Sequence, residues 1–234
     1  MKIYGKNVAI ERLNGNEKIN KIYLSNKFND SQIISLIKKK NINTKIVENK
    51  ELDKMCKGLH QGIIMEVDDI KTYSLEEIIP NIDKEYPLVV ILDHLEDPHN
   101  FGAIIRTANQ AGAHGVIIPK RRAVGLTATV ARTSAGALNY TPVAKVTNIV
   151  QTMEELKKEG LWFVCADMGG ETMYRLNLKG AIGLVIGNEG DGVSKLVKEN
   201  CDMIASIPMK GDIDSLNASV AAGVLAYEIV RQRM

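Results

Sequence analysis

The stretch PLVVILDHLEDPHNFGAIIRTANQAG, residues 87–112, joins a continuous apolar run to a turn and then to a helical pattern. The run at 88–95 does not alternate polar and apolar residues, which is typical of a strand covered by helices on both faces. The helical pattern carries one arginine, Arg106, in a segment otherwise built mainly of Ala, Ile and Gly. The stretch therefore predicts one unit of a parallel sheet and raises the question of what Arg106 does.

Apolar runs of the same kind recur towards the C-terminus. They lie at 115–119, 141–146, 161–167, 181–188 and 203–209, with helical patterns between or after them at 128–138, 149–160, 193–200 and 215–233. Alternating strands and helices of this type predict a parallel α/β domain, which we place at 87–234.

The first third of the chain predicts a separate, smaller α/β unit. Helical patterns occupy 7–13, 30–41 and 51–58, and strand patterns occupy 21–25, 44–48 and 62–67. The following segment is more polar and ends against Pro87. We therefore expect a first domain at 1–72 and a linker at 73–86.

The charge of the chain is unevenly distributed. Residues 1–60 contain 13 Lys and Arg against 6 Asp and Glu, a balance of +7, so the remainder carries −5 within the overall +2. A basic segment favours a polyanionic partner such as nucleic acid, because Lys and Arg contacts to phosphates release counterions. A lysine-rich face that is simply solvated explains the same count.

The cysteines and the apolar runs bear on the compartment. The three cysteines, Cys56, Cys165 and Cys201, show no spacing typical of a disulfide framework, a zinc site or a redox dithiol, so no metal is expected. The opening residues MKIYGKNVAIERL interrupt their apolar positions with charges, and no run is long enough to cross a bilayer. These features predict a cytoplasmic protein.

Three polar segments each lie at the carboxyl end of a predicted strand, the edge at which open parallel sheets bind ligands. They are residues 96–112, LVIGNEGDGVS at 184–194 and IPMKGDIDSLNASVAAG at 207–223. GNEGDG spaces its glycines as G-x-x-G-x-G, which matches neither the dinucleotide fingerprint nor a phosphate loop. The spacing argues against a nucleotide-dependent oxidoreductase but leaves a purely structural glycine turn open.

Taken together, the three segments resemble the three motifs of the SpoU (TrmH-type) RNA ribose methyltransferases of the SPOUT class. Their order and spacing agree over the whole second domain. The first domain, with GKNVAIERL at 5–13 and HQGIIMEV at 60–67, resembles the small RNA-binding domain, similar to ribosomal protein L30e, that precedes the catalytic domain in some members.

The resemblance implies S-adenosyl-L-methionine as cofactor, a trefoil knot in the sheet of the second domain, and a homodimer whose active site draws on both subunits. It implies methylation of a ribose 2′-hydroxyl of RNA, with a guanosine of 23S ribosomal RNA, free or in an assembling large subunit, as the preferred target. A transfer RNA, another ribosomal RNA position and a non-catalytic ribosome-assembly module are the alternatives. Intact motif residues argue against the last of these.

By resemblance, Arg106 is the residue tied to catalysis. An arginine is a poor base because its pKa lies above about 12 in proteins. Either its surroundings depress that pKa, or the guanidinium holds a phosphate and the ribose oxygen by forked hydrogen bonds while another group accepts the proton. We prefer the second interpretation, because positioning the attacking oxygen is itself a large catalytic effect.

Three further residues match polar positions of the motifs. Asn100 is expected to cap the helix from the preceding turn and to orient Arg106 or the RNA. Glu189 is expected to stabilise the glycine-rich loop and to pair with Arg106, with a purely structural role as the alternative. Asn217 is expected to contact the substrate or Arg106, although a helix cap also explains it.

The remaining expected contacts concern the cofactor and the RNA. By resemblance, the backbone at Gly187, Ile207 and Leu216 holds the cofactor, with Asn188 and Met209 as additional contacts. Two basic clusters are candidates for RNA phosphates, with solvated surface as the alternative; they are Lys38, Lys39 and Lys40 in the first domain and Lys120, Arg121 and Arg122 in the second. Such contacts position RNA without reading its sequence.

Overall fold

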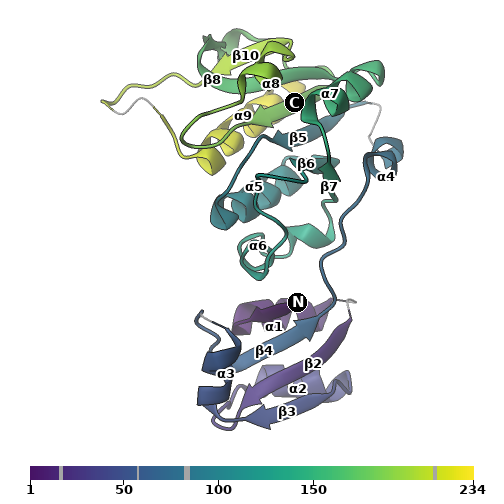
Figure 1. Cartoon of the computed structure of the whole chain (residues 1–234), viewed down its shortest axis with the longest axis vertical. Helices are drawn as coiled ribbons and strands as arrows, with labels where there is room; N and C mark the ends of the chain where they lie inside the picture. Colours follow the sequence, from purple (N-terminus) through teal and green to yellow (C-terminus); the bar gives the residue numbers. More distant parts are fainter. Residues whose placement is uncertain (16–17, 57, 82–84, 213–214) are drawn as a thin grey trace. The chain divides into compact units, whose positions relative to one another are not determined.

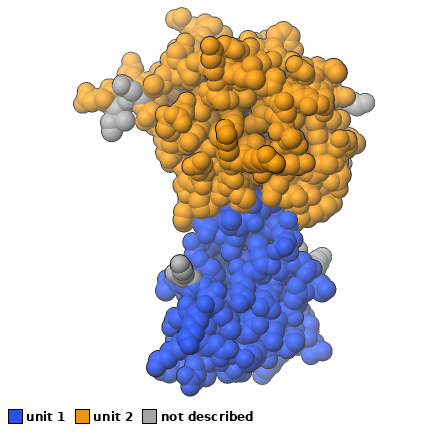
Figure 2. Space-filling model, in the orientation of Figure 1, with its two compact units in different colours: residues 1–70, 126–136 blue, residues 71–125, 137–234 orange. Residues whose placement is uncertain are grey.

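The chain, described by a computed structural model over residues 1–15, 18–56, 58–81, 85–212 and 215–234, forms two compact units. Unit 1 comprises 1–70 and 126–136, and unit 2 comprises 71–125 and 137–234 (Figure 2). Residues 82–84 of the expected linker and 213–214 of the third motif lie outside the described residues.

Unit 1 is a four-stranded mixed sheet with helices on both faces (Figure 1). Its strands run in the order β1-β4-β2-β3, with β2 parallel to β3 and antiparallel to β4. The elements are β1 (Lys2–Tyr4), α1 (Lys6–Asn14), β2 (Ile19–Ser25), α2 (Ser31–Lys39), β3 (Thr44–Val47), α3 (Asn49–Met55) and β4 (Ile63–Val67). The three-residue β1 was not predicted, because it is too short to show a period.

The core of unit 1 explains why these segments fold together. Apolar residues of α1 and α2, such as Leu13 and Ile33, are buried against Ile22 and Met65 of the sheet. Leu52 of α3 is buried in a separate cluster with Ile64. Successive β4 residues face opposite ways, so α1 and α2 cover one face of the sheet and α3 covers the other.

A helix from the middle of the chain belongs to unit 1. It is α6 (Ala128–Thr133), which contacts β1 and contributes Ala128 and Ala131 to the core around Leu13. The guanidinium of Arg132 lies over the ring of Tyr4, 5.5 Å from its centroid. The sequence predicts this helix but gives no sign that it leaves the second domain's core.

Unit 2 is built on a six-stranded, wholly parallel sheet in the order β10-β8-β9-β5-β6-β7. Every residue of β5, β6 and β9 is buried, which confirms the interpretation of the continuous apolar runs. The strands are β5 (Leu88–Leu92), β6 (Gly115–Pro119), β7 (Val143–Val146), β8 (Trp162–Thr172), β9 (Ile182–Ile186) and β10 (Met203–Ser206).

Helices cover both faces of this sheet (Figure 1). On one face, α4, α7 and α8 share a core cluster with alternate strand residues such as Val89 and Ile117. On the other, α5 packs against α9, which also contacts β8 and β9. The helices are α4 (Leu75–Ile78), α5 (Pro98–Gln110), α7 (Ile149–Lys158), α8 (Lys195–Glu199) and α9 (Ala218–Arg233), with short 3-10 turns at Ile79–Asn81, Ala137–Asn139 and Met173–Arg175.

The segment expected to be a linker contains structure of its own. Tyr73 makes a parallel bridge to Ala144 beside β7, and Leu75 and Ile78 of α4 are buried in the core of unit 2. Ser74 and Glu77 form a capping box at the start of α4. This part of the chain thus extends unit 2 beyond its sheet.

No helix within the described parts of the chain combines the length and apolar character that crossing a membrane requires.

Candidate active site

The first motif begins with a well-capped helix. The carboxylate of Asp97 accepts hydrogen bonds from the backbone N–H of His99 at 3.0 Å and of Asn100 at 3.3 Å. Pro98 occupies the first turn, where a missing N–H removes no helical bond. The expectation that Asn100 caps this helix is therefore wrong: Asp97 is the cap, and the Asn100 side chain is free for other contacts.

Asn100 uses that freedom to join residues from all three motifs. Its Nδ2 donates to Oε1 of Glu189 at 2.6 Å, and Nδ2 of Asn217 donates to the same oxygen at 2.5 Å. Nδ2 of Asn217 also lies 3.0 Å from Oδ1 of Asn100. Glu189 lies 89 positions and Asn217 lies 117 positions after Asn100 in the sequence, yet the three side chains form one polar network.

The sheet order explains why these residues meet. β5 and β9 are adjacent and parallel, with Val90 opposite Leu184, so the loops that follow them leave the same edge. Asn100 lies on the helix after β5, and Glu189 lies on the loop after β9. Asn217, at the start of α9, caps that helix through Oδ1 and donates to the network through Nδ2. The side chain of Asn217 therefore caps the helix and joins the polar network at the same time.

The loop that carries Glu189 folds tightly back on itself. Asn188 and Gly192 exchange two backbone hydrogen bonds, at 3.0 and 2.9 Å. A Cβ on Gly187 would lie 2.0 Å from the carbonyl carbon of Gly192, and Gly192 has a φ of +67°. The turn therefore requires glycine at Gly187 and favours it at Gly192.

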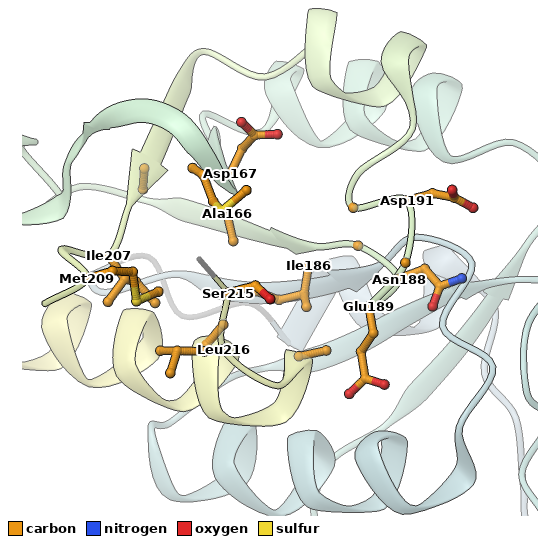
Figure 3. A pocket seen from close by; sticks show the side chains of 17 residues that line it. Ala166, Asp167, Ile186, Asn188, Glu189, Asp191, Ile207, Met209, Ser215 and Leu216 are labelled. Atoms are coloured by element: carbon orange, nitrogen blue, oxygen red, sulfur yellow. The ribbon is translucent and has the colours of Figure 1, made fainter. Parts of the chain in front are cut away.

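A cavity of about 270 Å³ lies beside this turn. Figure 3 shows Ile207, Met209, Ser215 and Leu216 lining it from the third motif and the residues from Asn188 to Asp191 lining it from the glycine-rich loop. All five residues expected to contact the cofactor line this cavity: Gly187, Asn188, Ile207, Met209 and Leu216.

The sequence analysis missed the contribution of β8 to this cavity. Ala166, Asp167 and Met168 line it. Lys198 pairs with Asp167 at 2.7 Å, and this hydrogen-bonded pair holds the pKa of the Asp167 carboxyl below its usual value. Asp167 ends the apolar run LWFVCAD at the edge where the three motifs meet, and that position was the signal available in the sequence.

Arg106 and Glu189 differ from expectation in their surroundings. Arg106 is exposed on α5, and no hydrogen bond or ion pair that the structure describes joins it to Glu189 or to either asparagine. Glu189 is itself exposed, so its two amide donors are not needed to offset burial. The expected pairing of Arg106 with Glu189 is absent from the described contacts of this chain.

The two basic clusters lie in different units. Lys38 and Lys39 end α2 of unit 1, and the ammonium group of Lys40 donates to the carbonyl of Gly15. Lys120, Arg121 and Arg122 follow β6 in unit 2 and are exposed.

Two family models match the chain over most of its length. Residues 87–227 match the model of the SpoU rRNA Methylase family. Residues 2–73 match the model described as RNA 2′-O ribose methyltransferase substrate binding.

Individual proteins agree with these models. A Bacillus subtilis (strain 168) protein, YacO, whose name places it in the TrmH family of tRNA/rRNA methyltransferases, is 46% identical over 99% of this chain and 95% of its own. The 23S rRNA (guanosine-2′-O-)-methyltransferase RlmB of Neisseria meningitidis is 40% identical over the same shares. The SpoU methyltransferase AviRb of Streptomyces viridochromogenes, solved with the cofactor AdoMet, is 25% identical, with a TM-score of 0.85 over 100% of this chain and 90% of its own.

With both domains matched and the three motif residues joined beside a ligand-sized cavity, the chain belongs to the SpoU family of RNA 2′-O-ribose methyltransferases, which use S-adenosylmethionine.

Proposed function

We propose that this protein methylates the ribose 2′-hydroxyl of a guanosine in 23S ribosomal RNA. The observation that carries the proposal is the 40% identity to the Neisseria RlmB enzyme along almost the full length of both chains, substrate-binding domain included. The Asn100–Glu189–Asn217 network beside the cavity supports it, because the polar positions of all three motifs are present and in contact.

The cavity fits S-adenosylmethionine in its chemistry. Ile207, Met209 and Leu216 offer apolar surface to an adenine ring, while the backbone around Gly187 offers polar groups at close approach. Its volume, about 270 Å³, is near the lower end of ligand pockets. When bound, the cofactor supplies an electrophilic methyl group on a sulfonium.

We assign Arg106 the task of positioning the RNA. Arg106 is exposed, and the planar fork of a guanidinium matches a phosphate and an adjacent ribose oxygen. Asn100, Glu189 and Asn217 hold the neighbouring loops in register. The network then acts on the shape of the site, and Arg106 acts on the substrate.

Unit 1 and the two basic clusters supply affinity for the RNA. The first domain, which we take to be of the L30e-like type, matches a substrate-binding family model and holds the excess of positive charge in residues 1–60. Lys38–Lys40 and Lys120–Arg122 contact phosphates in this proposal, which accounts for affinity and orientation without base recognition.

A homodimer and a knotted sheet complete the proposal. Val220 and Tyr227 of α9 are 49% and 51% exposed, a large exposure for apolar side chains on a helix next to the site. In this proposal a second copy covers these side chains, and the active site draws on both subunits. Light scattering on the purified protein tests this, with a mass near 52 kDa expected from twice 25.8 kDa and a mass of one chain contradicting it.

The deciding experiment measures transfer of a tritiated methyl group from S-adenosylmethionine into unmodified 23S, 16S and transfer RNA, followed by mapping of the modified ribose by primer extension. We expect incorporation into 23S RNA at one guanosine. Incorporation into transfer RNA alone would overturn the 23S assignment in favour of the other RNA class in the name of the Bacillus relative. If Glu189→Ala methylates 23S RNA much more slowly than the unaltered protein does, the activity belongs to this site.

A further inference from the structure

A second cavity, of about 610 Å³, lies at the same edge of the unit 2 sheet. It is formed where β5, β6 and β7 end, together with the first residues of α7 and part of α8. None of its lining residues lines the cofactor cavity, which lies at the ends of β8, β9 and β10. The two cavities thus occupy opposite halves of one sheet edge.

The rim of this second cavity is strongly positive. Lys120, Arg121 and Arg122 line it, and no salt bridge in the described part of the chain involves any of the three. Asp93 is the carboxylate among the lining residues, and outside them the pKa of Glu76 is lowered mainly by a hydrogen bond with Ser74 and to a smaller degree by the charge of Lys120. Cations left without partners around a concavity attract anions.

The floor of the cavity holds a histidine in an unusual setting. His94 has a φ of +57°, in the left-handed region that a residue with a side chain rarely adopts. Its Nδ1 lies 2.5 Å from Oδ1 of Asp93, a fully buried carboxylate whose Oδ2 accepts the backbone N–H of Ser194 at 2.7 Å. The imidazole of His94 therefore lies beside a buried carboxylate and also lines the cavity.

The start of α7 adds to the positive potential. Thr147, Asn148, Ile149 and Val150 line the cavity, and Asn148 caps the helix by accepting from Gln151 N at 3.2 Å. The positive end of a ten-residue helix therefore faces the same space as the three cations.

We propose that this second cavity is a phosphate-binding site for the RNA backbone beside the target nucleotide. Lys120, Arg121 and Arg122 supply most of the attraction, and a ring N–H of His94 donates a hydrogen bond to a phosphate oxygen. The inference rests on the proposed function in one respect, the identity of the RNA that is bound.

The test compares two matched double variants of the full-length protein. Arg121→Gln with Arg122→Gln removes two cations from the rim, whereas Lys158→Gln with Lys179→Gln removes two exposed cations before β8 and β9, at the opposite edge of the sheet. The dissociation constants of 23S and transfer RNA transcripts are measured by filter binding over a series of KCl concentrations.

We expect the rim variant to bind whichever RNA is methylated at least tenfold more weakly. The slope of log K against log[KCl] should decrease by about 0.7–0.9 for each phosphate that the variant no longer neutralises. The affinity for S-adenosylmethionine should be unchanged. His94→Asn, a residue that tolerates positive φ, should weaken RNA binding by about tenfold, the usual effect of losing a charged hydrogen bond. The control pair should match the unaltered protein.

Equal RNA affinity and salt slope in the rim and control variants would overturn the proposal, even if 23S RNA proves to be the substrate. The unaltered protein could methylate transfer RNA while the rim variant binds that RNA more weakly. This result would overturn the proposed 23S target but support the assignment of the cavity. If millimolar inorganic phosphate raises the melting temperature of the unaltered protein but not of the rim variant, while RNA affinity is the same in both, the cavity holds free phosphate instead.

Discussion

One carboxylate oxygen, Oε1 of Glu189, accepts from amides that lie on two different helices. Such hydrogen bonds to a charged acceptor are stronger than neutral ones, but solvent around the exposed Glu189 reduces the contribution of each. Asn217 also caps α9 through Oδ1, so both its amide oxygen and its amide nitrogen are held by hydrogen bonds. Oε1 of Glu189 therefore joins the second motif to the first and the third, which Asn217 and Asn100 also join directly.

Glu189→Ala should lower the rate of methyl transfer by roughly 10- to 100-fold, since it removes both charge-assisted bonds. Glu189→Gln keeps an oxygen in the same place and should recover much of that loss. Initial rates with saturating cofactor and RNA measure both. Full activity in Glu189→Ala would show that the network has no part in the reaction.

Arg106→Ala should separate activity from stability. Because Arg106 is exposed, the free energy of unfolding should change by no more than about 0.5 kcal/mol. Methyl transfer should fall by at least about 100-fold through loss of substrate positioning, while calorimetry should give an unchanged cofactor affinity. Arg106→Lys, which keeps the charge but not the fork, should also be strongly impaired. Near-normal transfer in Arg106→Ala would refute the assignment.

At the scale of elements, the glycine-rich loop between β9 and α8 carries Glu189 of the network and lines the cavity that we propose for the cofactor. Two of its glycines form a matched pair for a test. A Cβ at Gly187 would meet the backbone of Gly192 at 2.0 Å, whereas a Cβ at Gly190 would meet nothing within 4 Å.

Gly187→Ala should therefore weaken S-adenosylmethionine binding by tenfold or more, because the turn must shift away from the cavity that it lines. Gly190→Ala changes another lining residue but forces no shift of the turn, so it should bind the cofactor more tightly than Gly187→Ala does. Isothermal titration of each variant gives the comparison. Equal cofactor affinity in the two variants would mean that the close turn is unimportant for the cavity.

Helix α9 carries a buried carboxylate that makes its stability depend on pH. Glu228 accepts from Nε and Nη2 of Arg231 at 2.8 and 2.9 Å and from Gln232 at 2.8 Å. These bonds, that from Arg231 foremost, hold the pKa of Glu228 below its usual value of 4.5. A depressed pKa stabilises the fold above about pH 4.5, and this contribution is lost as the pH falls further.

Glu228→Gln should lower the melting temperature at pH 7 and make it less sensitive to acid below about pH 4.5. Glu154→Gln, at an exposed position on α7, should shift the midpoint at pH 7 by less than about 2 °C. Scanning calorimetry between pH 3 and 7 measures both. A Glu228→Gln protein with the same acid dependence as the unaltered chain would contradict this account.

At the scale of the whole molecule, the two units do not divide the chain at one point. Residues 126–136 belong to unit 1, while Leu75 and Ile78 belong to the core of unit 2. A cut between the units must therefore retain α4 with unit 2 and leaves α6 without its apolar partners in unit 1.

Two truncations test this division. A protein of residues 71–234 should melt at least about 5 °C above one of residues 87–234, because the shorter chain loses the buried side chains of Leu75 and Ile78. In both, the amides of α6 should exchange with solvent faster than in the full chain. Equal melting temperatures would show that 71–86 adds nothing to unit 2.

The sequence by itself determined the parallel sheet of the second domain, because strands buried on both faces must be apolar throughout and that pattern is visible in a single chain. It also indicated, through resemblance, five residues that line the cavity that we propose for the cofactor. The sequence was less decisive about where the helix after β5 begins. Asp97 and Asn100 are both suitable N-cap residues, and only Pro98, which favours the first turn of a helix, indicates Asp97.

The tertiary structure alone decided which distant residues meet. The Asn100–Glu189–Asn217 network depends on β9 lying next to β5, and the order of strands in a sheet is not encoded in the period of any one strand. The transfer of α6 to unit 1 and the second cavity, assembled from the ends of three strands, have the same origin. Each is a long-range contact, set by how apolar faces pack and beyond the reach of local pattern.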